Sequence, residues 1–160
     1  MTISADGHIA RLNDEAPWSP EEFARCNEFI QEVGNIIVGR RTYEIMKAAG
    51  DFNENVETIV LSKASAADQG KVHFVSSPKE AVDYLQAKNF QTAVVSGGTA
   101  TNAAFLDAGL LDEIILDVEP IILGEGLPLF SPGSREAKME LLEMQKLDTN
   151  AIRVHYRVIQ

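Results

Sequence analysis

Residues 92–106, TAVVSGGTATNAAFL, place a short apolar run directly in front of two adjacent glycines and a helical pattern. Glycines let another group approach the backbone closely, and the first turn of the following helix offers unpaired N–H groups with a partial positive charge. Phosphate is the natural ligand of such a turn. Tight packing of the strand against the helix explains the same glycines, because the stretch is not a full GxGxxG motif. Both interpretations stay open on this stretch alone.

Three further β-rich runs end in glycine or serine, as strands do before a loop. They are NIIVG at 35–39, ETIVLS at 57–62 and KVHFVS at 71–76, and with TAVVSG at 92–97 they are interleaved with helical patterns at 19–33, 77–88 and 99–109. Strands that alternate with helices indicate a largely parallel sheet covered on both faces.

The helical patterns have recognisable ends. Ser19 is a candidate N-cap in front of Pro20, and the same Ser-Pro start recurs at residues 77–78. The pattern at 99–109 ends at Gly109, which suits a left-handed cap. Along the first helix one face carries the apolar residues Phe23, Cys26, Ile30 and Val33.

The last third of the chain has a different character. Residues 112–123, 138–147 and 151–159 read as three successive strands without a helical pattern, which indicates an antiparallel edge. The first strand must be very short, because the turn-like Ala5-Asp6-Gly7 follows Met1 so soon. We expect one α/β domain over residues 1–160, with a mixed, mostly parallel central sheet flanked by helices and antiparallel C-terminal strands.

The composition argues against several functional classes. The formal net charge of -10 opposes general binding to nucleic acid, and the apolar runs are far shorter than the ~20 residues of a membrane span. The N-terminal segment lacks the pattern of a signal peptide, and a single cysteine, Cys26, excludes an internal disulfide, so we expect a cytoplasmic protein. His8, His73 and His155 stand far apart, so we expect no metal site.

A second junction also suits an anion. Gly39 closes a strand, and Arg40, Arg41 and Thr42 open a helical pattern. Two guanidiniums and a hydroxyl at a helix N-terminus match phosphate oxygens, and basic residues there oppose the helix dipole instead of stabilising the helix. A solvated pair of charges is the alternative. The sequence favours an anion site.

These junctions carry a family resemblance. The stretches PWSPEEF, VGRRTYEIM, IVLS and VVSGGTATNAAFL resemble those of dihydrofolate reductases in order and spacing, and the resemblance extends over nearly the whole chain. The segment AGLLDEIILDVEPIILGEGLPLF is more similar to the reductase domain of the riboflavin-pathway deaminase-reductases. Both families share one fold and use NADPH, so the resemblance implies the dihydrofolate reductase-like fold and a reductase of a small heterocyclic substrate.

The resemblance implies an NADPH site made from several segments. Arg40 to Thr42 would contact the cofactor phosphates, Ser62 and Lys63 would lie near the adenosine 2′-phosphate, and Gly97-Gly98 matches the pair that the family joins by a cis peptide. Trp18 would belong to a mobile loop that closes over the nicotinamide. The complete implied cofactor set is Ala5, Ile9, Ala10, Gly39, Arg40, Arg41, Thr42, Leu61, Ser62, Lys63, Ser96, Gly97, Gly98, Thr99, Ala100 and Thr101.

On the substrate side the resemblance implies a carboxylate near the start of the first helix. Glu22 is the better match and Glu21 the alternative. Such a carboxylate holds the heterocycle and assists its protonation. Ser19-x-x-Glu22 is also a capping box, in which Glu22 would only bond the backbone of Ser19. Phe23 and Cys26 would line the pocket, although core packing explains them equally well.

Three positions depart from the family patterns. Val56 stands where folate reductases carry the arginine that grips the folate tail, and Val95 stands where riboflavin-pathway reductases commonly carry a glutamate. Asp117 replaces the family threonine that pairs with the acidic substrate residue. Our main expectation is a dihydrofolate reductase, with the ribosylamino-pyrimidine reductase of riboflavin synthesis or a non-catalytic NADPH-binding module as alternatives. Because riboflavin-type relatives often pair through their last strands, we also expect a homodimer.

Overall fold

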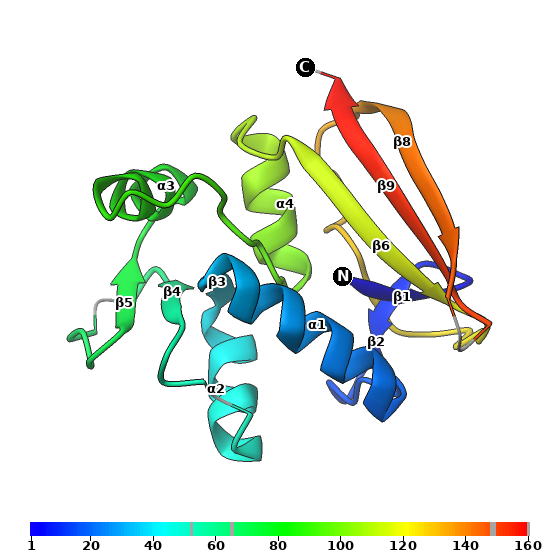
Figure 1. Cartoon of the computed structure of the whole chain (residues 1–160), viewed down its shortest axis with the longest axis horizontal. Coiled ribbons are helices and arrows are strands. Elements are labelled where there is room, and N and C mark those ends of the chain that lie inside the picture. Colours follow the sequence, from blue (N-terminus) through cyan, green and yellow to red (C-terminus); the bar gives the residue numbers. More distant parts are fainter. Residues whose placement is uncertain (52, 65, 148–149, 160) are drawn as a thin grey trace.

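The computed structural model describes residues 1–51, 53–64, 66–147 and 150–159. The helices are α1 (Pro20–Val33), α2 (Arg40–Ala49), α3 (Pro78–Ala87) and α4 (Thr99–Asp107). The strands are β1 (Thr2–Ser4), β2 (His8–Ala10), β3 (Asn35–Gly39), β4 (Glu57–Leu61), β5 (Val72–Val75), β6 (Glu113–Glu119), β7 (Leu127–Pro128), β8 (Lys138–Lys146) and β9 (Ile152–Ile159). Figure 1 shows the long strands β6, β9 and β8 on one side and the shorter β3 to β5 on the other.

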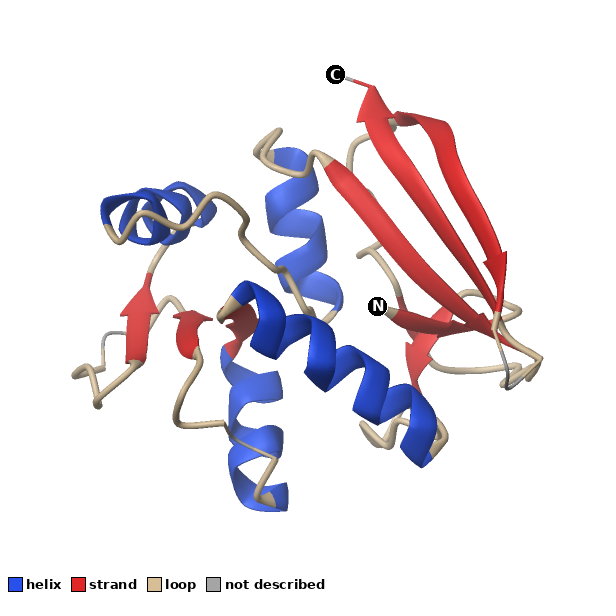
Figure 2. Ribbon diagram, in the orientation of Figure 1, coloured by secondary structure: helices blue, strands red, loops and turns tan. Residues whose placement is uncertain are grey.

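The strands form a parallel part and a mixed part, which confirms the expected α/β class. Strands β3, β4 and β5 pair in parallel, in that order. The second sheet has the order β1-β6-β9-β8, in which β1 and β6 are parallel and the C-terminal strands are antiparallel, as expected. The short β2 and β7, which the sequence did not indicate, pair with each other. Figure 2 shows the helices around the parallel strands.

The prediction of a strand over 92–97 is wrong in one respect. This segment lies alongside β3, but it pairs with that strand through a single parallel bridge between Ile37 and Val95. At its start the side chain of Asn35 replaces the backbone partner, because it donates to Thr92 O at 2.7 Å and accepts from Val94 N at 3.1 Å. The segment is therefore an extended connection that leads into the glycine pair, and it does not form a regular strand.

The helix starts agree with the sequence. The Ser19 hydroxyl accepts from Glu22 N at 3.1 Å with Pro20 in the first turn, and Ser77 and Pro78 repeat the arrangement in α3. Helix α4 ends two residues earlier than the predicted 99–109, and Gly109 takes the left-handed conformation (φ 68°) after the cap residue Ala108. Strand β6 is shorter than the predicted 112–123, because Pro120 lacks the N–H that would extend the ladder.

Both faces of the parallel sheet are covered, as expected. One face packs on α1 and α2 through a cluster that includes Ile30, Val38 and Tyr43. The other face packs on α3 and α4 through Leu85 and Phe105. The predicted apolar face of α1 is partly wrong, because Phe23 is 44% exposed while Ile30 is buried and Cys26 packs at the edge of the cluster.

Candidate active site

The two glycine junctions that the sequence identified separately lie against each other. Gly39 N donates to Gly97 O at 2.8 Å, and Gly98 N donates to Thr42 Oγ1 at 3.1 Å. The peptide between Gly97 and Gly98 is cis, as the resemblance implied. The N-cap residues of α2 and α4, Gly39 and Gly98, are therefore joined at one edge of the parallel sheet.

The close approach explains why glycine stands at position 39. A Cβ atom at Gly39 would lie 2.6 Å from Thr101 Oγ1, which is closer than real Cβ contacts come. The start of α4 is also fixed from its other side, because Thr99 Oγ1 donates to Pro128 O at 2.6 Å and Asn102 Nδ2 donates to Leu129 O at 2.9 Å. Residues 97–101 thus form a turn with little room for movement, with Ala100 exposed.

Within the described residues, the N-termini of α2 and α4 carry neither a side-chain cap nor an acidic residue in the first turn. Helices α1 and α3 have both, since a serine caps each and a glutamate stands in the first turn. The starts of α2 and α4, with their uncapped N–H groups and dipoles, therefore lie close together. Such an arrangement attracts an anion.

The two arginines of this junction are exposed and carry carboxylate partners. Arg40 Nε donates to Glu44 at 2.8 Å, and its guanidinium lies 5.6 Å from the centre of the Phe74 ring. Arg41 Nε donates to Asp14 at 2.8 Å, so this side chain connects α2 to the loop that holds Trp18. Both side chains remain accessible to a ligand, because they lie on the surface.

The remaining residues of the implied cofactor set come from several elements. Leu61 pairs with Gly39, which places Ser62 and the exposed Lys63 directly after the neighbouring strand. Ile9 is buried, and its Cδ1 would lie 3.8 Å from a Cβ at Gly98. Ala10 pairs with Leu127, and the exposed Ala5 donates its N–H to Ile121 O at 2.8 Å. Trp18 is half-buried and precedes the cap of α1, and Ser96 N donates to Ile37 O.

A second group of functional side chains meets between α1 and the mixed sheet. Glu22 is only 2% exposed, whereas Glu21 is exposed. The Glu22 carboxylate accepts from Thr2 Oγ1 at 2.6 Å and from Arg25. Ser19 still caps the helix, but these bonds turn the carboxylate toward the sheet and not toward the Ser19 backbone, so the full capping box does not form.

Asp117 lies next to Glu22 and is held by an arginine. It is 5% exposed, and Arg153 Nε and Nη2 donate to its two oxygens at 2.6 Å each. Burial acts to raise the pKa of Asp117, but the hydrogen bonds from Arg153 and with Glu22 outweigh it and hold the pKa below its ordinary value. The residue that replaces the family threonine therefore interacts with Glu22, the carboxylate that the resemblance implies for the substrate.

Glu119 completes this group one strand repeat further along β6. It is 9% exposed, and its Oε1 atom is buried without a hydrogen-bond partner among the residues that the structure describes. Burial, and then the negative charge of Glu22, raise the pKa of Glu119. Burial likewise raises the pKa of the Cys26 thiol nearby. We call Glu22, Asp117 and Glu119 the acidic pocket.

Sequence reasoning missed Glu119 of the acidic pocket and the residues that hold the other two acids in place. It did not identify Thr2, Arg25, Glu119 or Arg153, and it noted Asp117 only as a departure. One signal was available, because the strand EIILDVE carries acids at alternate positions within an apolar run, which puts both on one face.

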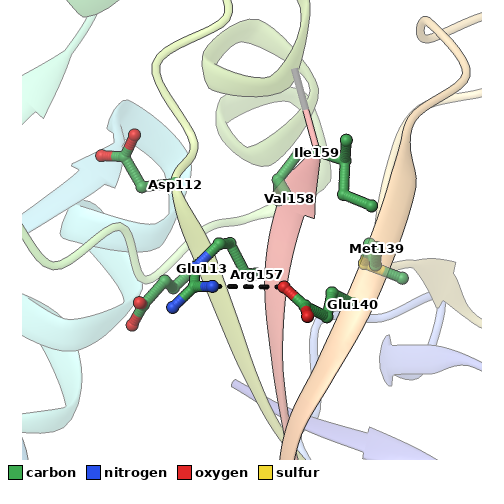
Figure 3. Close-up of a pocket in the computed structure, with 7 residues that line it drawn as sticks. All are labelled: Asp112, Glu113, Met139, Glu140, Arg157, Val158 and Ile159. Atoms are coloured by element: carbon green, nitrogen blue, oxygen red, sulfur yellow. Dashed lines mark hydrogen bonds and ion pairs between the residues drawn. The ribbon is translucent and has the colours of Figure 1, made fainter.

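Two hollows lie outside these groups. A cavity of about 330 Å³ between α1, the end of α2 and the start of β4 is lined by Asn27, Ile30, Gln31, Ile36, Met46, Gly50, Asp51, Asn53, Glu54, Val56 and Thr58. Figure 3 shows the other hollow, on the C-terminal sheet, where Arg157 and Glu140 face each other across β9 and β8 at 3.1 Å. The described residues contain no cluster suited to a metal ion and no helix that could cross a membrane.

Comparisons with known proteins show similarity over nearly the whole chain. A family model described as RibD C-terminal domain matches residues 1–152. Uncharacterized protein YwjB of Bacillus subtilis is 25% identical over 164 residues, which cover 98% of this chain and 94% of the relative. Uncharacterized protein YyaP of the same organism is 22% identical over 171 residues, covering 98% and 91%.

Solved structures share the fold. A protein of Shewanella sp. PV-4 assigned to riboflavin biosynthesis matches with a TM-score of 0.81 at 22% identity, over 100% of this chain and 97% of that chain. The diaminohydroxyphosphoribosylaminopyrimidine deaminase/5-amino-6-(5-phosphoribosylamino)uracil reductase of Thermotoga maritima gives 0.76 at 19% identity, over 99% of this chain and 55% of the larger enzyme. A pyrimidine reductase-like protein of Corynebacterium diphtheriae gives 0.76 at 16% identity, over 100% and 90%.

Proposed function

The chain belongs to the RibD C-terminal domain family, and we propose that it is an NADPH-dependent reductase that transfers a hydride to a C=N bond of a ribosylamino-pyrimidine. The family match over residues 1–152 supports this substrate class over dihydrofolate, which was our main expectation from the sequence. Small-molecule reduction also agrees with the net charge of -10, which disfavours nucleic acid as a partner.

The meeting of the two uncapped helix N-termini is the observation that carries the cofactor proposal. A dinucleotide presents two adjacent phosphates, and the first turns of α2 and α4, which begin directly after Gly39 and Gly98, offer two neighbouring sets of uncapped N–H groups. Arg40, Arg41 and Thr42 would bind phosphate oxygens from one side, and residues 97–101 from the other. Ser62 and Lys63 would bind the adenosine 2′-phosphate at the end of the neighbouring strand.

The chain's own residues then orient the reactants. Bound NADPH supplies the hydride. Ile9 and Ala5 would lie against the nicotinamide, because Ile9 is beside Gly98 at the end of the turn. Glu22, fixed by Thr2 and Arg25, would accept hydrogen bonds from N–H groups of the heterocycle and set its orientation. Trp18, Phe23 and Cys26 would help to exclude water from the pocket.

The cavity beside Val56 supports a substrate other than folate. A folate tail is anionic, and the resemblance locates its arginine at the position of Val56. In this chain the cavity lined by Val56 carries the carboxylates Asp51 and Glu54 instead. Like charges repel, so this cavity disfavours an anionic tail. Val95 marks a departure from the riboflavin branch too, and it packs with the core cluster beside Ile37.

We also propose that the protein is a homodimer that works in the cytoplasm. Every residue of β8 is exposed, and the apolar side chains include Met139 at 46%, Leu141 at 53% and Met144 at 67% exposure. An edge strand with exposed apolar residues is suited to pairing with a second copy. Sedimentation of the wild type and of a Leu141→Glu/Met144→Glu variant tests this, with a monomeric wild type as the contradicting result.

The decisive test follows NADPH absorbance with the pyrimidine intermediate and, separately, with dihydrofolate. We expect oxidation with the pyrimidine and none with dihydrofolate. NADPH binding is measured independently by fluorescence, using Thr42→Val as a variant that loses the hydroxyl at the junction. Binding without oxidation of any substrate would support the non-catalytic alternative, and no binding at all would contradict the cofactor proposal.

A further inference from the structure

The acidic pocket contains three carboxyl groups, of which one is differently placed from the other two. Glu22 accepts hydrogen bonds from Thr2 and Arg25, and Asp117 accepts two from Arg153. Glu119 Oε1 is buried, yet none of the described residues gives it a hydrogen bond. A buried polar atom without a partner is costly to keep, so it indicates a group that enters the site from outside.

The strand register puts Glu119 on the same sheet face as Asp117. Thr2 lies opposite Asp117 and Ser4 lies opposite Glu119, so the two acids share the sheet face that α1 covers with Glu22. Glu119 is the last residue of β6, and Ala5 directly follows Ser4 at the end of β1. Glu119 therefore lies opposite Ser4, the residue directly before Ala5, at which the proposed function locates the nicotinamide.

The surroundings of Glu119 favour its neutral form. The charged groups that face it are Glu22 and Arg25 from α1 and Asp117 from its own strand. Two of these three are acids, and burial adds to their effect, so the pKa of Glu119 is raised and its neutral form is favoured. A neutral carboxyl group can donate an O–H hydrogen bond, which an ionised one cannot.

We propose that Glu119 is the proton donor for reduction of the C=N bond, a role that rests on the proposed function. The C=N carbon gains a hydride as a C–H bond of NADPH breaks, which oxidises the cofactor to NADP⁺. The π electrons of C=N move to the nitrogen, which takes the proton from the Glu119 O–H. The product is an amine, and Glu119 is left as a carboxylate that regains a proton from water.

The first experiment compares Glu119→Gln with the wild type in NADPH oxidation over a range of pH. The wild-type rate should be highest where Glu119 is protonated and should fall as the pH rises through its raised pKa. The Gln variant keeps the shape but has no acidic proton, so kcat should fall roughly 100-fold, KM should change little, and the pH-dependent fall should vanish. Glu119→Asp keeps an acidic proton, so its kcat should be at least about tenfold higher than that of Glu119→Gln.

Glu28→Gln, which removes an exposed carboxylate further along α1, is the matched control and should leave kcat unchanged. If the wild type turns over while Glu119→Gln keeps its rate and pH profile, the role of Glu119 is wrong and the proposed function stands. If the wild type binds NADPH but oxidises it with neither substrate, both proposals are overturned.

A second measurement needs no substrate. Since the folded protein holds the Glu119 proton to higher pH than the unfolded chain does, the free energy of unfolding should decline as the pH rises from the ordinary glutamate pKa through the raised value. Glu119→Gln should lessen this decline, as measured by urea unfolding at several pH values. An unchanged pH dependence in the folded variant would show that Glu119 is already ionised and cannot act as the donor.

Discussion

Helices α1 and α3 supply their own N-terminal partners, whereas α2 and α4 do not within the described residues. Ser19 and Ser77 cap the first pair, and acids stand in their first turns. Glycines stand at the same positions in the second pair, and Gly39 and Gly98 are joined through the neighbouring junction. A helix that has its own cap is stable without a ligand, while one without a cap keeps its N–H groups for another molecule.

Among substitutions at the two uncapped helices, α2 and α4, filling the space at Gly39 should have the largest effect on stability and NADPH affinity. In Gly39→Ala the new Cβ meets Thr101 Oγ1, and such overpacking should lower the free energy of unfolding by about 1–3 kcal/mol. The same displacement of the junction should weaken NADPH binding by about 100-fold, which corresponds to roughly 2.8 kcal/mol of binding free energy. Calorimetric titration measures the affinity. Adding Thr101→Ala removes the clashing hydroxyl and should restore part of both losses.

An acidic residue in the first turn of α4 should make its N-terminus resemble that of α1, which already carries acids there. Ala100 is exposed, and Ala100→Glu should stabilise the helix by about 0.3–1 kcal/mol through its dipole. The same charge repels phosphate, so NADPH affinity should fall roughly tenfold, or about 1.4 kcal/mol. Ala100→Gln is the control of equal size. A Glu variant that binds NADPH as tightly as the Gln variant would contradict phosphate binding at α4.

Removing a cap from one of the serine-capped helices, α1 and α3, should lower stability without changing NADPH affinity. Ser19→Ala deprives Glu22 N of its hydroxyl partner and should cost about 1 kcal/mol of unfolding free energy. NADPH affinity should stay within about twofold of the wild type, because α1 starts away from the phosphate junction. Urea unfolding and titration on the same preparation make the comparison. A large loss of affinity would mean that the two helix types are not functionally separate.

The smallest effect should be a change in pH dependence at α3. Glu80 accepts from Ser76 N at 2.8 Å, and this hydrogen bond holds the pKa of Glu80 below its ordinary value. The stability that it contributes is present above the unfolded glutamate pKa and is lost as the pH falls through the lowered value. Glu80→Gln should therefore flatten the acid side of the stability curve slightly, as measured by urea unfolding at several pH values.

The two glycine junctions were predictable because their signals are local. A glycine followed by a helical pattern reveals the junctions at Gly39 and at Gly97-Gly98 without knowledge of the fold. The failed strand at 92–97 shows the limit of this reasoning, because the Asn35 side chain that interrupts its pairing lies 57 positions before Thr92. Nothing in the TAVVSG stretch itself signals that interruption.

The acidic pocket was harder to predict because it depends on strand register. Thr2 meets Glu22 across 20 positions, and Asp117 meets Arg153 across 36. These residues become neighbours only when β1 and β9 pair with β6, and a pattern within one segment cannot reveal that pairing. The prediction for Phe23 was wrong for a related reason. Helical periodicity shows which face of α1 is apolar, but it does not show how far along α1 the covering elements extend.

The alternation along β6 also protects the fold against misassembly. Asp117 and Glu119 face α1, while Leu116 lies in the opposite cluster with Ile3, Ile9 and Val154. A pairing error of one residue would exchange the faces, so that two carboxylates would enter the hydrophobic cluster and Leu116 would meet Glu22. The charges of the acidic pocket thus help to select the correct strand register during folding, because the correct alignment pairs Asp117 with Arg153.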